Sequence, residues 1–310
     1  MTHHVHGLHH VTSIASDAQK NNDFFTHTLG LRRVKKTVNF DQPDTYHLYY
    51  GDMTGSAGTV MTYFPFRQAA PGRPGSGEVS QTVFSVAKGF LPFWKDRLAK
   101  LGVQGLVEET RFGERRLTFK APDGDAFALV EVEEDPRQGW VGAGVQQDEA
   151  VRGFHSATLR LRDGTETGEL LAFMGYEVIE AEGSLTRYRA KIGNGANFID
   201  IDVQPGLPRA SQGAGSVHHI AFSVPDRAAQ LLVRKSLLDT GYQVTPVIDR
   251  DYFWAIYFRS PGGVLFEVAT DEPGFDRDEP VDHLGEALKL PEQHERLRAQ
   301  LETYLDPIID

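Results

Sequence analysis

The chain has 310 residues, of which 40% are hydrophobic and 24% are charged, a composition typical of globular proteins with a substantial core. Its net charge of -11 and its lack of a basic run argue against nucleic acid or an anionic membrane as partner, because both require clustered Lys and Arg. The chain contains no cysteine, so any metal must be bound by nitrogen and oxygen atoms.

The first ten residues, MTHHVHGLHH, lack the basic and apolar regions of a secretory signal, and no apolar run approaches the roughly 20 residues of a membrane span. These features predict a cytoplasmic protein without a membrane partner. The cluster of His3, His4 and His6 is interpreted as part of a solvated tail.

Periodicity predicts a strand at 8–15, followed by a helix that Asp17 caps and that ends at Gly30. Three strand-like runs follow this helix, at 31–40, 45–52 and 58–66. The order of elements in this segment is therefore βαβββ.

The same order recurs three more times along the chain. Its opening strand and helix fall at 79–89 with 89–102, at 154–163 with 168–176, and at 217–226 with 227–241. The predicted helices end at Gly30, Gly102, Gly175 and Gly241, as expected of glycine in a left-handed cap. The repetition predicts an α+β fold of four βαβββ modules that form two domains with curved mixed β-sheets.

The expected organisation is an N-terminal domain of two modules at 1–145, a C-terminal domain of two modules at 146–275, and a helical tail at 276–310. The tail is interpreted as a packing element or a contact in a homo-oligomer. Segments 68–78 and 205–215 are rich in Pro, Gly and Ala and are interpreted as linkers or mobile loops.

Two histidine doublets, His9-His10 and His218-His219, open the first strands of the first and fourth modules. Because side chains alternate along a strand, His10 and Thr12 share one face, and His219 lies on the corresponding face of the fourth module. If both concave faces line one cup, two imidazoles converge there from distant parts of the sequence.

A carboxylate in the fourth module completes a possible metal site. Glu267 lies among apolar neighbours in the strand VLFEVAT, where a lone charge is costly unless it is paired or ligated. Two imidazoles and one carboxylate form the ligand set that leaves three positions open on Fe(II). The matching position in the first module is Thr62, a poor ligand, so a fourth protein ligand is missing and oxygen chemistry is favoured.

Alternatives to this site remain open. Each doublet is also compatible with two hydrogen-bonded structural histidines, and the choice of ligand within a doublet is not fixed. The second histidine is preferred because it directly precedes the alternating strand. His155 occupies a similar place in the third module, but Gln81 and Leu129 cannot complete a site around it, so we interpret His155 as structural.

Three segments, GLHHVTSIASDAQKNNDFFTHTLGLRRVKKTVNFDQPDTYHLYYGD, SVHHIAF and SPGGVLFEVATDEPGF, resemble the ring-cleaving dioxygenases of the vicinal oxygen chelate superfamily. The most similar branch includes the hydroquinone dioxygenases, and the resemblance spans about residues 7 to 275. It implies an Fe(II) or Mn(II) centre bound by His10, His219 and Glu267.

The resemblance also implies roles near the metal for His9, Thr12, Arg250 and Tyr257. Tyr257 precedes Glu267 by ten residues, so neighbouring antiparallel strands can aim both into the cup, where Tyr257 would hydrogen-bond a phenolate and Arg250 would stabilise anionic intermediates. His9 would act as the acid or base for phenolic protons, which requires a bulge because neighbours on a strand face opposite ways.

The function implied is a non-haem Fe(II)-dependent, extradiol-type ring-cleaving dioxygenase that acts on a hydroquinone or catechol and inserts both atoms of O₂. One alternative is a glyoxalase-like metal-dependent isomerase or thiol transferase on the same modules. A second alternative is a binding module that sequesters an aromatic compound without turnover.

Overall fold

A computed structural model describes residues 5–310, so the interpretation of His3 and His4 as a solvated tail lies outside the described residues. For His6 that interpretation is wrong. Its backbone N–H donates to the carbonyl oxygen of Ser223 at 2.8 Å, and the residue is half-buried. The chain is therefore already attached to the fourth module before the first strand begins.

The four predicted βαβββ modules are all present. The first comprises β1 (Leu8–Ala15), α1 (Ala18–Asp23), the π-helical turn η1 (Phe24–Thr28), β2 (Arg32–Val38), β3 (Tyr46–Gly51) and β4 (Val60–Pro65). The second comprises β5 (Glu78–Ala87), α2 (Leu91–Lys100), β6 (Gln104–Arg111), β7 (Glu114–Lys120) and β8 (Ala126–Val132). The third comprises β9 (Gly153–Leu161), α3 (Thr165–Phe173), β10 (Tyr176–Glu182), β11 (Leu185–Ala190) and β12 (Phe198–Val203). The fourth comprises β13 (Ser216–Val224), α4 (Arg227–Asp239), β14 (Ile248–Asp249), β15 (Phe253–Arg259) and β16 (Leu265–Pro273).

In the first module, the predicted N-terminal cap and the predicted terminating glycine of the helix are both confirmed. The carboxylate of Asp17 accepts a hydrogen bond from the backbone N–H of Lys20 and caps α1. Gly30 adopts a φ of +67° just after η1, a conformation that side chains with a Cβ rarely adopt. None of the helices within residues 5–310 has the length and apolar character required to cross a bilayer.

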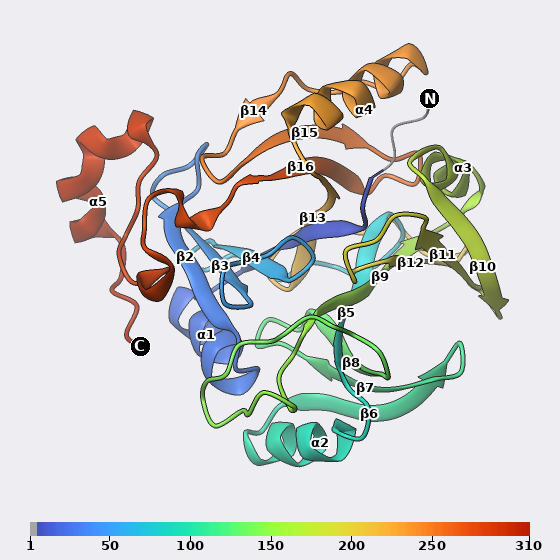
Figure 1. Ribbon diagram of the computed structural model, residues 1–310, viewed down its shortest axis with the longest axis horizontal. Coiled ribbons are helices and arrows are strands. Elements are labelled where there is room, and N and C mark those ends of the chain that lie inside the picture. Colours follow the sequence, from blue (N-terminus) through green and yellow to red (C-terminus); the bar gives the residue numbers. More distant parts are fainter. Residues whose placement is uncertain (1–4) are drawn as a thin grey trace.

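Two mixed sheets of eight strands carry the modules, as predicted for the fold class (Figure 1). One sheet has the order β14-β15-β16-β13-β1-β4-β3-β2 and joins the first module to the fourth. The other has the order β10-β11-β12-β9-β5-β8-β7-β6 and joins the second module to the third. Each sheet thus draws on both halves of the chain, and the division into domains at 1–145 and 146–275 stays a proposal.

The register of the first sheet gives its two modules equivalent positions. Thr12 on β1 lies opposite Thr62 on the parallel strand β4, as Ala221 on β13 lies opposite Glu267 on the parallel strand β16. Across the antiparallel pair β1 and β13, Thr12 faces His219. Thr62 is therefore the structural counterpart of Glu267, as predicted.

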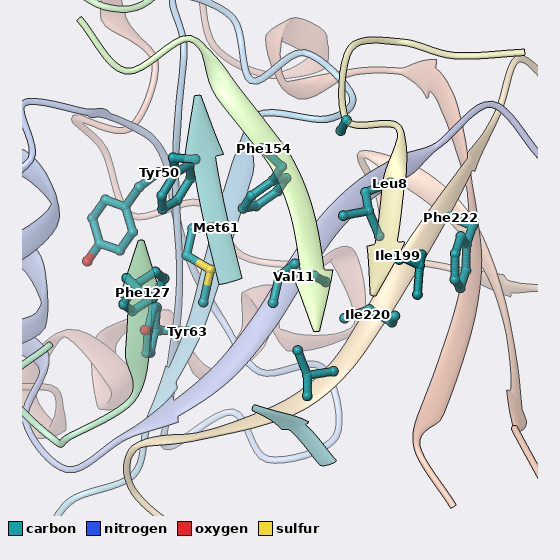
Figure 2. Packing of buried hydrophobic residues seen from close by; sticks show 14 of the residues in the cluster. Leu8, Val11, Tyr50, Met61, Tyr63, Phe127, Phe154, Ile199, Ile220 and Phe222 are labelled. Carbon is teal, nitrogen blue, oxygen red and sulfur yellow. The ribbon is translucent and has the colours of Figure 1, made fainter. Parts of the chain in front are cut away.

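A continuous apolar core joins the two sheets. Figure 2 shows Leu8 and Val11 of β1 in the same cluster as Phe154 of β9 and Ile199 of β12, all of them without exposed surface. Burial of each such side chain contributes about 1.5 to 3 kcal/mol. Because these residues occupy one face of each sheet, the polar residues that alternate with them lie on the other face.

The segment after residue 273 packs along β2, one of the two edge strands of the first sheet (Figure 1). It contains three short 3-10 turns and one helix, namely η2 (Phe275–Arg277), η3 (Val281–His283), η4 (Glu292–Leu297) and α5 (Arg298–Tyr304). Lys36 forms a parallel bridge with Leu288, and the ammonium of the buried Lys35 lies 2.6 Å from Asp278 and 2.5 Å from Glu279. The tail therefore covers a sheet edge that would otherwise present unpaired backbone groups.

The two segments predicted to be linkers pair with each other instead. Isolated bridges join Arg73 to Ser211 and Ser76 to Arg209. Their glycines permit this close approach, because a Cβ on Gly75 would lie 2.4 Å from the carbonyl oxygen of Pro208. The segments act as ordered crossings between the two sheets.

Candidate metal centre

Three ligand-type side chains converge on the concave face of the first sheet. His10 on β1, His219 on β13 and Glu267 on β16 place their ligand atoms within 4.8 Å of one another. The Nε2 atoms of the two histidines lie 3.4 Å apart, and Oε2 of Glu267 lies 3.3 Å from His10 and 2.8 Å from His219. It is the one group of this kind among residues 5–310.

The donor set fits a divalent cation. Both carboxylate oxygens of Glu267 are buried without a hydrogen-bond donor, which is costly unless a cation compensates them. Ligand atoms bound at right angles about 2.1 Å from one ion lie about 3 Å from each other, close to the three separations found here. One carboxylate and two neutral imidazoles also leave coordination positions open.

The electrostatics keep these groups ready to bind a metal. Burial opposes ionisation of Glu267, but His10 and His219 outweigh it and hold the pKa of the carboxyl well below its usual range. Burial lowers the pKa of His219 in spite of the nearby Glu267. A charged carboxylate beside a neutral imidazole is the state that a metal requires.

Each doublet orients its second histidine through its first. The Nδ1 atoms of His9 and His10 lie 2.9 Å apart, and those of His218 and His219 lie 2.7 Å apart. Nε2 of His10 and of His219 faces Glu267. When the second histidine donates from Nδ1 to the first, this Nε2 is unprotonated and available to a metal. The geometry therefore favours the second histidine of each doublet as the ligand.

His9 comes close to His10 because the register of β1 against β13 shifts between Leu8 and His10, the irregularity that sequence reasoning required. His9 is buried and packs against the ring of Phe253. Burial, followed by the charge of His10, lowers the pKa of His9 to about 3. His9 therefore contacts His10, which lines the cavity, without lining the cavity itself, and its lowered pKa favours the neutral form.

A cavity of about 410 Å³ opens over the two histidines. Its walls are formed by His10, Asn39, Phe40, Asp41, Gln42, His47, Phe64, Phe66, His218, His219, Arg250, Phe253, Tyr257 and Leu265. Aromatic rings with a few converging polar groups are the usual lining of a site for a small organic ligand.

Arg250 and Tyr257 lie in the cavity wall, as predicted. The Nε of Arg250 donates to the hydroxyl oxygen of Tyr257 at 3.3 Å, and its Nη2 lies 3.5 Å from the carboxylate of Asp41. Tyr257 is directly opposite Glu267 in the antiparallel pair β15 and β16. Burial and the charge of Glu267 raise the pKa of Tyr257, so its hydroxyl keeps a proton to donate.

Sequence reasoning missed a second group of polar residues on the first module. His47 and Tyr49 lie on β3, with His47 Nε2 2.7 Å from Thr62 Oγ1 and the Tyr49 hydroxyl 2.8 Å from His47 Nδ1. Thr62 in turn donates to Thr12 at 3.0 Å. The alternation of the segment YHLYY was a signal that residues 47 and 49 share one face.

The equivalent face of the second sheet holds an ion-pair network instead of a metal site. Nε2 of His155 lies 3.0 Å from Glu114, which also pairs with Arg187 at 2.6 Å. Arg187 forms two further bonds to Asp200. These contacts agree with the structural role predicted for His155.

The sequence signature of the Glyoxalase/Bleomycin resistance protein/Dioxygenase superfamily matches residues 7–129. The protein MhqO of Bacillus subtilis (strain 168), which is named for a ring-cleaving dioxygenase activity, is 45% identical over 302 residues, or 97% of this chain and 96% of MhqO. The chain belongs to this superfamily.

Further comparisons agree with that membership. The chlorohydroquinone/hydroquinone 1,2-dioxygenase of Sphingobium indicum (strain UT26S) is 36% identical over 318 residues, 98% of each chain. A crystal structure of a protein from Bacillus subtilis (strain 168) that is described as a dioxygenase superposes with a TM-score of 0.96, at 44% identity over 99% of this chain and 98% of that one. Glyoxalase I from Zea mays shares the fold alone, with a TM-score of 0.64 at 11% identity over 86% of this chain and 92% of that one.

Within the superfamily, relatives at 35 to 45% identity over nearly the whole chain are named ring-cleaving dioxygenases. The chain is accordingly an enzyme of the ring-cleaving dioxygenase class, an oxidoreductase. The family predicted from the two doublets and the segment around Glu267 is confirmed.

Proposed function

We propose that this dioxygenase of the glyoxalase fold is a non-haem Fe(II) enzyme that opens the ring of a hydroquinone or a catechol in an extradiol manner and inserts both atoms of O₂. His10, His219 and Glu267 would hold the metal, with Mn(II) as the alternative to Fe(II). The observation that carries the proposal is the convergence of these three side chains below an aromatic-walled cavity.

When bound, the metal supplies a Lewis-acidic redox centre with positions open to two small ligands. The protein supplies the rest of the site. Phe40, Phe64 and Phe253 line the cavity and suit the faces of a single aromatic ring. The cavity of about 410 Å³ has room for a single substituted aromatic ring.

Tyr257 is placed to donate a hydrogen bond to an anionic oxygen of the ring. Arg250 donates to the hydroxyl oxygen of Tyr257, so the single O–H proton of Tyr257 is not used in that bond. The guanidinium also adds positive charge beside the cavity, which favours a deprotonated substrate. We therefore propose that both side chains stabilise negative charge on the ring.

The observation that disfavours a glyoxalase-like isomerase or thiol transferase is the chemistry at the position equivalent to Glu267. That position holds Thr62, whose hydroxyl is already bonded to Thr12 and His47. A binding module without turnover is disfavoured by the relatives, which are named as enzymes over nearly the whole chain.

The proposal is tested by loading the full chain with Fe(II) without oxygen and recording oxygen uptake with a panel of hydroquinones and catechols. One O₂ per ring is expected with at least one compound. Absence of uptake with iron demonstrably bound would contradict the proposal and direct attention to the isomerase reaction.

Two matched variants locate the metal. His219→Gln is expected to abolish iron binding, because it removes one of three ligands. His155→Gln changes the corresponding histidine of the second sheet and is expected to leave the iron content unchanged. Equal iron contents in both variants would show that the proposed ligand set is wrong.

A further inference from the structure

Four side chains beside the metal centre are linked by successive hydrogen bonds, which together are called the hydrogen-bond chain. It runs from Tyr49 through His47 and Thr62 to Thr12, with successive separations of 2.8, 2.7 and 3.0 Å. All four side chains are buried. Three strands contribute to the chain, so it crosses the floor of the cup from β3 to β1.

The bond between the two threonines fixes the direction of every other bond in the chain. Thr62 donates to Thr12, so the proton of Thr62 is used and its oxygen must accept from His47 Nε2–H. A neutral imidazole carries one N–H, so Nδ1 of His47 must accept the proton of Tyr49. Burial, followed by the charges of His10 and His219, lowers the pKa of His47 well below its usual value, which keeps the ring neutral.

The chain ends in a donor that has no protein acceptor. Within residues 5–310, the hydroxyl of Thr12 has Thr62 as its hydrogen-bond partner, and in that bond Thr12 accepts. Thr12 lies two residues from His10 on the same face of β1 and directly opposite His219 on β13. Thr12 is therefore next to the strand positions of both histidines of the candidate metal centre, and its hydroxyl keeps a proton that no protein acceptor within residues 5–310 takes.

We infer that Tyr49, His47 and Thr62 are positioning residues that hold the hydroxyl of Thr12 as a donor to an oxygen atom of a small molecule bound at the metal centre. The inference rests on the proposed function and deepens it. It also gives Thr62, the counterpart of Glu267, a definite role, because the protein places a directed hydrogen-bond chain where a fourth ligand would lie. The acceptor is an oxygen of either the ring substrate or O₂.

The kinetic test compares Thr62→Val, which removes the hydroxyl at nearly constant volume, with Thr62→Ser, which retains it. Thr62→Val is expected to lower kcat/KM roughly tenfold, the effect of one lost hydrogen bond. Thr62→Ser is expected to restore most of the activity, and neither change should alter the iron content. A KM change for the aromatic compound identifies the ring oxygen as the acceptor, whereas a KM change for O₂ identifies dioxygen.

The structure offers a matched control next to the chain. Thr37 on β2 lies opposite His47, and its buried hydroxyl has no hydrogen-bond partner. Thr37→Val is therefore expected to leave the kinetics unchanged. If Thr37→Val lowers kcat/KM as much as Thr62→Val does, then removal of any hydroxyl on this face lowers activity through packing. That result would overturn the inference.

A double-mutant cycle shows whether Thr62 acts through Thr12. If it does, adding Thr62→Val to Thr12→Val causes no further loss. Independent, multiplicative losses would overturn the inference. Thermal unfolding of each variant separates lost positioning from lost folding.

A final readout does not depend on activity. The ¹⁵N chemical shifts of the His47 ring, measured in the full chain loaded with diamagnetic Zn(II) and assigned with His47→Gln, report which nitrogen is protonated. Protonation at Nε2 is expected. Protonation at Nδ1 would contradict the direction inferred for the hydrogen bonds from Tyr49 to Thr12. If oxygen uptake is absent but Nε2 carries the proton, the proposed function fails while the hydrogen-bond chain stands.

Discussion

At the scale of single residues, the two doublets place imidazoles in matched pairs. In each pair the first histidine is neutral, with a pKa lowered by burial to about 3 for His9 and about 4 for His218. The first histidine can therefore accept a hydrogen bond from Nδ1–H of the second. In that arrangement Nε2 of the second histidine is unprotonated and free for the metal.

Replacement of the first histidine should accordingly weaken metal binding without abolishing it. For His218→Ala, we expect a rise in the Kd of Fe(II) of roughly 10- to 100-fold, the usual cost of losing a group that orients a ligand. Anaerobic metal titration measures this change. Unaltered affinity would mean that the Nδ1 contact has no orienting role.

Tyr257 is predicted to matter for turnover and not for the metal. Tyr257→Phe retains the ring but removes the donor, so kcat should fall roughly 10- to 100-fold while iron content stays constant. Parallel iron analysis and steady-state kinetics check the prediction. A variant with full kcat would remove Tyr257 from the catalytic machinery.

At the scale of elements, a buried pair links β4 of the first module to the start of β8 in the second. The hydroxyl of Tyr63 donates to the carboxylate of Asp125, which has 6% of its surface exposed. Burial raises the pKa of Asp125 to about 6. The folded protein therefore binds a proton more tightly than the unfolded chain, whose aspartates titrate near a pKa of about 3.9.

The raised pKa of Asp125 makes the stability of the protein depend on pH. Between about pH 4 and pH 6 the folded state holds more protons, so the contribution of Asp125 to stability is present below that window and is lost as the pH rises through it. By pH 7 this lowers the free energy of unfolding by about 3 kcal/mol relative to its value below pH 4. Asp125→Asn keeps a neutral acceptor for Tyr63 and should remove this dependence, so the variant gains stability relative to the native chain as the pH rises. Urea unfolding of both proteins at pH 4 and pH 7 measures the difference, and parallel curves would refute it.

Local patterns in the sequence were sufficient for the elements and for part of the site. The alternation after each doublet, the capping Asp17 and the glycines at helix ends depend on neighbours within a few residues, so they predicted the modules and the candidate ligands. The placement of His47 opposite Thr37 and next to Thr62, and the bulge beside His9, depend on strand register, which no local pattern specifies. The pairing of the segments around Arg73 and Ser211 escaped prediction for the same reason.

At the scale of the whole molecule, the tail touches the mouth of the cavity as well as β2. The side chain of Gln293 donates to the carbonyl oxygen of Phe40 at 3.2 Å, and Nε2 of His294 lies 2.9 Å from the same oxygen. Phe40 lines the cavity, and its ring lies 5.6 Å below the guanidinium of Arg250. A segment more than 250 residues away in the sequence thus helps to hold the wall of the site.

Removal of these contacts should affect substrate binding more than chemistry. The combined change Gln293→Ala and His294→Ala is expected to raise KM for the aromatic substrate roughly three- to tenfold with little change in kcat, because each neutral hydrogen bond contributes about 1 kcal/mol. Steady-state kinetics check the expectation. A fall in kcat at constant KM would place the role of the tail in the chemical step instead.

The measurement that tests the central claim most directly is the fate of hydroquinone and O₂ in a single reaction with the Fe(II)-loaded enzyme. We predict that one O₂ is consumed per ring, that the aromatic absorbance disappears, that no hydrogen peroxide accumulates, and that Glu267→Gln abolishes the reaction. Formation of benzoquinone with hydrogen peroxide, or a Glu267→Gln variant as active as the native chain, would contradict the claim.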